Sequence, residues 1–113
     1  MKFKTSQQSG VTVIAIDGNL MGGPDASSLN DKLVGLVGEK KHHVVIDISG
    51  VNIINSSGLG MLIKGASTMK SAGGGLKIAN ASEKILDLIK VTRLTGVLET
   101  FASVAEAAKS FRK

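Results

Sequence analysis

One stretch of the sequence decides the fold: Asp47-Ile48-Ser49-Gly50-Val51-Asn52-Ile53-Ile54-Asn55-Ser56-Ser57-Gly58-Leu59-Gly60. The apolar run Val44-Val45-Ile46 leads into it, and a helical pattern that starts at Leu59 leads out of it. Between them, Asn55-Ser56-Ser57-Gly58 places two hydroxyls where a helix begins. Ordinary capping explains part of this pattern, because Asn and Ser are both favoured at helix N-caps. A phosphoserine there would also meet the positive end of the helix and its free amide groups, so the stretch is a candidate modification site.

The segments on either side of this stretch predict a β-α-β unit. Residues 43–48 are apolar without alternation, which is typical of a central strand covered on both faces. After the serines the spacing becomes helical, with the apolar residues Leu59, Leu62, Ile63, Ala66 and Met69 on one face. Gly73-Gly74-Gly75 ends that helix, and Leu76-Lys77-Ile78-Ala79 is the next strand. The two strands are therefore expected to be parallel, with a right-handed crossover.

The N-terminal part predicts two strands and a helix. The strands are Phe3 to Gln7 and Val11 to Asp17, with Gln8-Ser9-Gly10 as the hairpin turn between them. A helix follows the Gly22-Gly23 loop, with Pro24 or Asp25 in its first positions. It ends at Gly38 and turns one apolar face inward, formed by Leu29, Leu33, Leu36 and Val37.

The C-terminal part predicts two further helices and a short strand. Asn80 with Glu83 is a capping pair for a helix whose apolar face is Ile85, Leu88 and Ile89. Val97 to Phe101 is a short edge strand. Ser103-Val104-Ala105-Glu106 is a capping box for a last helix that buries Val104, Ala107, Ala108 and Phe111. We expect a single α/β domain over residues 1–113, a small sandwich with a mixed, mostly parallel sheet of four to five strands and about four helices.

The composition restricts the classes of function. The 113 residues are 42% hydrophobic and contain no cysteine, which excludes disulfides and thiolate metal sites. The N-terminus lacks the apolar region of a signal peptide, and no apolar run approaches the roughly 18 residues of a membrane span. We therefore expect a soluble cytoplasmic protein with no membrane span. The net charge is +5, but the lysines are scattered and Phe is the only aromatic residue, so we expect no direct binding of nucleic acid.

Several motifs that could carry chemistry are incomplete. Gly58-x-Gly60 resembles the start of a dinucleotide fingerprint, but the third glycine position is Ile63. A phosphate-loop spacing fails because Ala66 stands at the lysine position. The adjacent His42 and His43 point to opposite sides of a strand and cannot easily share a metal. We therefore expect no catalytic residue, metal site or cofactor, and no enzymatic activity. Asp47, close to Ser49, is expected to accept hydrogen bonds from the loop that follows it.

The residues around the serines resemble a known signature. Asp47-Ile48-Ser49-Gly50-Val51, followed by Ile54-Asn55-Ser56-Ser57-Gly58-Leu59-Gly60, is similar to the signature of STAS domains, the sulphate transporter and anti-sigma factor antagonist domains of bacteria. Gly18-Asn19-Leu20 matches the turn after the family's second strand, and Arg93-Leu94-Thr95-Gly96-Val97-Leu98 matches its late segment. The resemblance covers essentially the whole chain and is closest to the stand-alone anti-sigma factor antagonists.

The resemblance implies a binding switch. The partner would be an anti-sigma factor that is also a serine kinase, sequestered while Ser56 is unphosphorylated and released when Ser56, or as second choice Ser57, carries phosphate. A metal-dependent serine phosphatase would reset the switch. The implied contact residues are Met21, Gly22, Asn55, Ser56, Ser57, Gly58 and Leu59. Asn55 stands where the family usually has Asp, and Met21-Gly22 stand where it usually has an acidic residue. The alternative is a non-phosphorylated scaffold or adaptor in a signalling or lipid-transport assembly.

Overall fold

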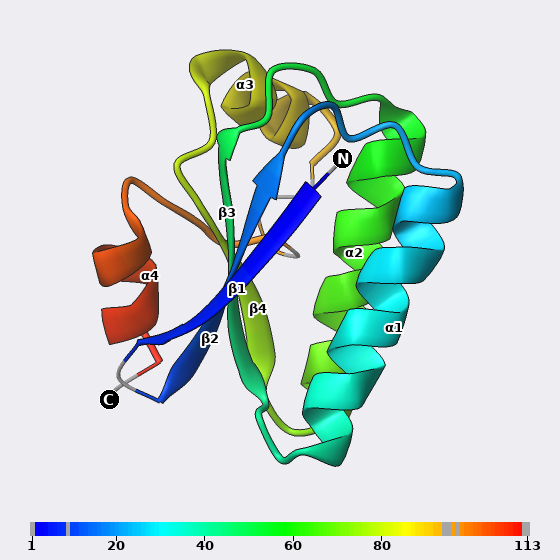
Figure 1. Ribbon diagram of the computed structural model, residues 1–113. Helices are drawn as coiled ribbons and strands as arrows, with labels where there is room; N and C mark the ends of the chain where they lie inside the picture. The colour runs from blue at the N-terminus through cyan, green and yellow to red at the C-terminus, as the bar shows by residue number, and fades with distance from the viewer. Residues whose placement is uncertain (1, 9, 94–95, 97, 112–113) are drawn as a thin grey trace.

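The computed structural model describes residues 2–8, 10–93, 96 and 98–111, and only the backbone of residues 24–26 (Figure 1). The elements follow the chain as β1 (Lys2–Gln8), β2 (Val11–Asp17), α1 (Pro24–Gly38), β3 (His43–Gly50), α2 (Ser56–Ser71), β4 (Gly75–Ala79), α3 (Glu83–Val91), β5 (Thr100–Phe101) and α4 (Val104–Lys109). No helix of the described residues is long and apolar enough to cross a bilayer.

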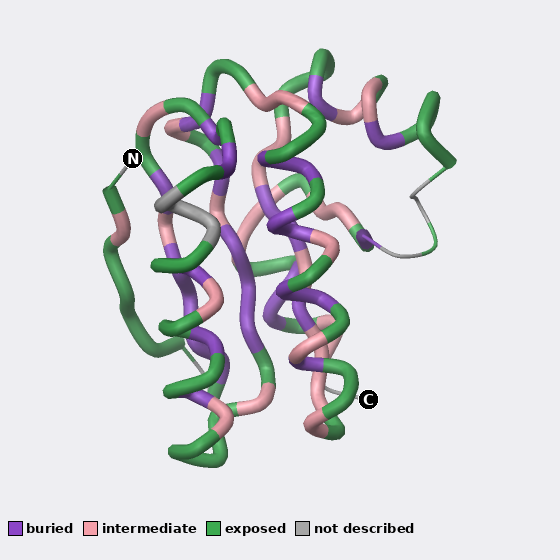
Figure 2. The backbone as a smooth tube through the Cα atoms, turned by 90° about the vertical axis from the view of Figure 1, so that its right-hand side faces the viewer, coloured by how far each residue is buried: buried purple, intermediate pink, exposed green. Residues whose placement is uncertain are grey.

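The strands form one five-stranded sheet in the order β1-β2-β3-β4-β5. β1 is antiparallel to β2, and the other neighbours are parallel, with Val13 opposite Val45 and Val44 opposite Leu76. The expected β-α-β unit is therefore confirmed as β3-α2-β4, within the expected mixed sheet. β1 forms one edge of the sheet and is exposed along almost its whole length (Figure 2).

Helices cover the two faces of the sheet unequally. α1 and α2 lie side by side on one face, α4 lies on the opposite face, and α3 lies near one end (Figure 1). Because side chains alternate along a strand, β2 supplies both faces. Ile14 and Ile16 enter the larger core beneath α1 and α2, whereas Val11 and Val13 enter a smaller core beneath α4.

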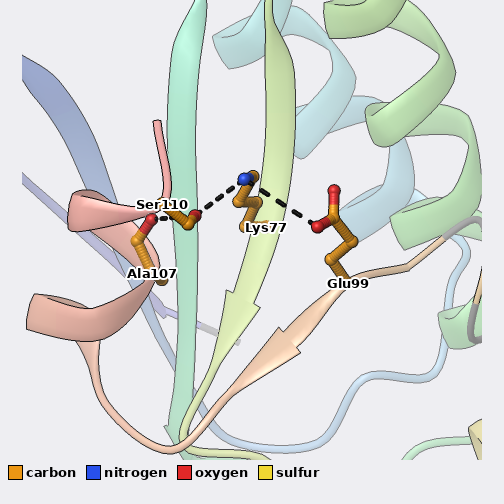
Figure 3. Close-up of polar contacts among 4 residues, drawn as sticks. All are labelled: Lys77, Glu99, Ala107 and Ser110. Atoms are coloured by element: carbon orange, nitrogen blue, oxygen red, sulfur yellow. Dashed lines mark hydrogen bonds and ion pairs between the residues drawn. The ribbon is translucent and has the colours of Figure 1, made fainter. Parts of the chain in front are cut away.

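A lysine fastens α4 to the sheet. The Lys77 ammonium donates a 2.7 Å hydrogen bond to Ser110 Oγ, which in turn donates 2.6 Å to the Ala107 carbonyl (Figure 3). The same ammonium lies 4.5 Å from the ring centroid of Phe111 and 3.9 Å from Glu99 Oε2. On the face of the sheet opposite α1 and α2, Lys77 therefore holds the end of α4 through a hydrogen bond and a cation–π contact.

The structure corrects one predicted cap and shifts other boundaries. Asn80 does not cap α3; Ser82 does, with its hydroxyl accepting from the Ile85 amide at 3.3 Å. Asn80 instead adopts a left-handed conformation, with φ of 62°, which Asn tolerates better than most residues. β5 is confined to Thr100–Phe101, shorter than the predicted strand, and Val97 lies outside the described residues. Ser9, in the predicted hairpin turn, and Leu94 and Thr95, in the late segment of the signature, also lie outside them.

Other local predictions are confirmed. β2 has the predicted bounds, and α1 starts with Pro24 at its N-terminus and ends at Gly38. The Ser103 hydroxyl accepts from the Glu106 amide at 3.1 Å, which is one of the two hydrogen bonds of the predicted capping box. The helix expected from Leu59 starts three residues earlier, so Ser56 is the first residue of α2. This last shift places both serines inside the first helical turn.

Candidate functional site

The site is the first turn of α2, and Asn55 fixes where that turn starts. Asn55 has an extended backbone, and its Oδ1 accepts a 2.7 Å hydrogen bond from the Gly58 amide. Its carbonyl oxygen accepts the first helical bond, 2.9 Å from the Leu59 amide. These two bonds use one side chain and one carbonyl to end the loop and begin the helix.

The loop after β2 is hydrogen-bonded to the segment that precedes α2. The Leu20 amide donates to the Ile53 carbonyl at 2.9 Å, and the Asn55 amide donates to the Leu20 carbonyl at 3.1 Å. Leu20 and Ile54 thus form a short parallel bridge beyond the ends of β2 and β3. The Gly18-Asn19-Leu20 turn and the serine loop, more than 30 residues apart in sequence, are therefore joined by main-chain bonds.

Glycine is required where the two loops meet α2. A Cβ atom on Gly58 would collide with the Leu20 carbonyl oxygen and lie 3.1 Å from Ile54 Cγ1. A Cβ atom on Gly22 would lie 2.7 Å from Ser57 Cβ, and Gly22 also has φ of 82°, which side chains rarely adopt. The predicted contact residues Met21, Gly22 and Asn55 to Leu59 are accordingly brought together at one corner of the molecule.

The two serines differ in their surroundings. Ser57 packs against Gly22, on the side of the β2–α1 loop. Both serines are exposed, and neither hydroxyl makes a hydrogen bond within the described part of the chain. Among the described residues, the amides of Ser56 and Ser57 also have no acceptor, as is usual at a helix start. Either hydroxyl could therefore be modified without breaking a hydrogen bond among the described residues, and Ser57 differs from Ser56 by its contact with Gly22.

Exposed apolar side chains border the serines. Met21 is 47% exposed and Ile53 is 53% exposed. Met21 follows Leu20, whose amide donates to the Ile53 carbonyl. A groove of about 260 Å³ continues from Ile53 to α3, lined by Asn52, Ile53, Ile54, Lys84, Ile85 and Leu88. Sequence reasoning missed Ile53, because an apolar residue close behind a buried strand reads as core. The one signal in the sequence that Ile53 could be exposed is its position between β3 and α2, outside the strand itself.

The electrostatics of this corner favour an anion over a cation. The first turn of α2 contains no acidic residue, so the positive end of the helix is not compensated from within the turn. Within the described residues there is no group of three His, Cys, Asp or Glu side chains that could hold a metal. Asn55, Ser56 and Ser57 are all uncharged.

A carboxylate at the end of β3 is used structurally. Asp47 Oδ1 accepts 3.0 Å hydrogen bonds from the Ser49 amide and from the Asn80 side chain. Partial burial alone would raise the pKa of Asp47, but the hydrogen bonds from Asn80 and Ser49 outweigh burial and hold this pKa below its usual value. The expectation that Asp47 bonds the following loop is confirmed, and its partner Asn80 ties β3 to the end of β4.

Comparisons with known proteins place this geometry in a context. The family model for the STAS domain matches residues 2–107. The anti-sigma-B factor antagonist of Bacillus subtilis is 32% identical over 77 residues, which cover 68% of this chain and 70% of that protein. A protein from Thermotoga maritima assigned as an anti-sigma factor antagonist superposes with a TM-score of 0.84 at 18% identity, over 98% of this chain and 95% of that one.

A further structural relative has been solved in two states. The anti-sigma factor antagonist SpoIIAA superposes with a TM-score of 0.73 in its unphosphorylated form, at 14% identity, over 96% of both chains. Its phosphorylated form also gives a TM-score of 0.73, at 16% identity, over 98% of this chain and all of that one. At these identities the two structural comparisons establish a shared fold.

Proposed function

The chain belongs to the STAS domain family, and we propose that it is an anti-sigma factor antagonist whose binding is controlled by phosphorylation of Ser56. In the unphosphorylated state it sequesters an anti-sigma factor that is also a serine kinase. Phosphate on Ser56 ends this complex, and a metal-dependent serine phosphatase restores it. The chain itself supplies a binding surface and no catalysis.

The observation that carries the proposal is the exposed hydroxyl of Ser56 in the first turn of α2. The turn is held by bonds from Asn55 and by the packing of Gly58 on Leu20, none of which involves the Ser56 hydroxyl. A phosphate would add close to two negative charges at pH 7. The fold can accept it without losing a bond, so the effect falls on the surface that a partner touches.

The relatives support an antagonist that is controlled by phosphorylation. The Bacillus subtilis relative is named for its action against an anti-sigma factor, and SpoIIAA is known in both unphosphorylated and phosphorylated forms. Ser56 is favoured over Ser57 because Ser57 packs against Gly22 on the side of the β2–α1 loop. Met21 and Ile53 add the exposed apolar area that a protein partner would bury.

One observation favours a second candidate, an unmodified STAS adaptor in a larger assembly. The cap before the serines is the uncharged Asn55, and Met21-Gly22 supply no carboxylate beside them. A kinase that reads an acidic residue next to its serine would not find one here. In this case the same corner binds a partner permanently.

The test is phosphorylation by a defined enzyme. The anti-sigma factor kinases of the source organism are purified one by one and incubated with the chain and ATP. Mass spectrometry should place one phosphate on Ser56 in the wild type and in Ser57→Ala, and none in Ser56→Ala. A chain that binds such a kinase yet stays unmodified would favour the adaptor.

A further inference from the structure

Gly60 is a helix residue for which packing among the described residues gives no reason. A Cβ atom built on Gly60 meets no atom of the described residues within 4 Å, and the residue is exposed. The other interior glycines of α2 are explained by packing, Gly58 against Leu20 and Gly65 against Leu33 Cδ1, 2.8 Å from its ideal Cβ. A glycine inside a helix costs stability relative to alanine, so Gly60 lowers the stability of α2 without a packing contact among the described residues that requires it.

The position of Gly60 connects it to the proposed switch. It follows Ser56 by four residues and Ser57 by three, so all three lie on neighbouring positions of the helix surface. With about 100° per residue, Gly60 lies opposite the buried face of α2, which is formed by Gly58, Leu59, Met61, Leu62, Gly65, Ala66 and Met69. Lys64 is the next residue on the outer face, one turn further on. This outer side of α2 is turned toward solvent with α1 beside it (Figure 2).

We propose that Gly60 is a contact residue of the partner-binding surface. Without a side chain at this point, the main chain of an acidic segment of the anti-sigma factor can pass against α2 one turn beyond Ser56. This inference rests on the proposed function and deepens it. It adds the outer face of α2, from Ser56 to Lys64, to the corner formed by Met21, Ile53 and the serines.

Charge identifies the chemistry of the segment. α2 carries Lys64 and Lys70 and contains no Asp or Glu, and its N-terminal end is positive. Asp31 of α1 lines the same hollow as Lys64, so the positive charge of the outer face comes from α2 and not from α1. A partner segment with acidic side chains complements this face, in keeping with the net charge of +5. Residues four apart on a helix have Cβ positions about 5–6 Å apart, so a phosphate on Ser56 would lie close to position 60 and would repel the same segment. The acidic segment would then be attracted by the positive face of α2 and repelled by the phosphate at the same place. In this way a single modification can end the complex.

The experiment compares two exposed helical glycines. Gly35 lies in α1, is also exposed, and has nothing within 4 Å of its ideal Cβ. Thermal unfolding of the free chain and calorimetric binding to the cognate anti-sigma factor, without ATP, are measured for wild type, Gly60→Ala and Gly35→Ala. Both variants should raise Tm by about 4 °C, because both relieve the same helix penalty. Only Gly60→Ala should weaken binding, by about tenfold or more, because its methyl group enters a close main-chain contact.

Each outcome decides the matter. Equal binding by all three chains overturns the role of Gly60 and leaves the proposed function standing. A lower Tm for Gly60→Ala also overturns it, because the glycine would then serve the fold. If the wild type binds none of the organism's anti-sigma factors, the proposed function itself fails. Higher salt should weaken the wild-type complex, and a complex insensitive to salt would contradict the acidic segment.

Discussion

The carbonyl oxygen of Leu20 occupies the space that a side chain on Gly58 would need. This contact joins the loop after β2 to the first turn of α2, and the bonds from Leu20 to Ile53 and from Asn55 to Leu20 surround it. The corner that carries Ser56 is therefore held by main-chain contacts between two loops.

Gly58→Ala is expected to lower the free energy of unfolding by about 3 kcal/mol, because the methyl group must displace main chain and not a flexible side-chain end. Urea unfolding of the purified variant measures this loss. Gly60→Ala, two residues further along the same helix, should stabilise the chain by about 0.5–1 kcal/mol and is the matched control. A loss below 1 kcal/mol for Gly58→Ala would show that the main chain at Leu20 can move away from position 58 at little cost.

Asn55 should stabilise the fold through its side-chain oxygen, which caps α2, and not through its side-chain NH2 group. Asn55→Ala removes the acceptor of the Gly58 amide and should cost about 1 kcal/mol. Asn55→Asp keeps an acceptor and adds a negative charge at the positive end of α2, so it should leave stability unchanged or raise it by about 0.3–1 kcal/mol. Ser82→Ala at the start of α3 is a reference for losing a cap of the same kind. A destabilised Asn55→Asp would contradict this role.

The carboxylate of Asp47 should make stability fall at acid pH. Because its pKa in the folded chain lies below the usual 3.8, ionised Asp47 stabilises the fold above that value, and this contribution is lost as pH falls through the folded pKa. Asn80→Gly removes the hydrogen-bond donor but keeps a residue that accepts φ of 62°. The difference in unfolding free energy between wild type and Asn80→Gly should be constant from pH 5 to 7 and should shrink below about pH 4. If the difference in unfolding free energy does not change with pH, the loss in Asn80→Gly does not come from the hydrogen bond to ionised Asp47.

Lys77 should hold α4 without affecting the proposed switch. Its side chain is 12% exposed, bonds Ser110 and lies over the Phe111 ring. Lys77→Met keeps the apolar stem and should cost about 1–2 kcal/mol, with faster amide exchange in α4. Glu99→Gln should change stability by less than about 0.5 kcal/mol, because the Glu99 side chain is 60% exposed. Partner binding should be unaffected in both variants, since α4 lies on the other face of the sheet from α2 (Figure 1).

Local pattern was sufficient to predict most of the fold. The unbroken apolar run of β3, the helical spacing after Leu59 and the glycines before β4 are short-range signals, and they predicted the β-α-β unit correctly. The capping box at Ser103 is equally local. Asn80 was misassigned because its side chain bonds Asp47, 33 residues away, and no local spacing reports such a contact.

The candidate site was predictable in its serines and not in its surroundings. Asn55 and the hydroxyls that follow it are a short-range helix-start signal, whereas the packing of Gly22 on Ser57 and of Gly58 on Leu20 depends on how two distant loops meet. The exposure of the Ile53 side chain depends on how the connection after β3 lies against the rest of the fold, and the local sequence pattern reports this only weakly. The sequence also does not distinguish Gly58 and Gly65, which have close packing contacts, from Gly60, which has none among the described residues.

The most direct test is the affinity of the cognate anti-sigma factor for three chains, wild type, Ser56→Ala and Ser56→Asp, measured before and after incubation with ATP. We expect wild type and Ser56→Ala to bind equally without ATP, and Ser56→Asp to bind at least about tenfold more weakly. After ATP, wild type should lose binding and Ser56→Ala should keep it. Wild type that carries phosphate on Ser56 and still binds with unchanged affinity would contradict the proposed switch.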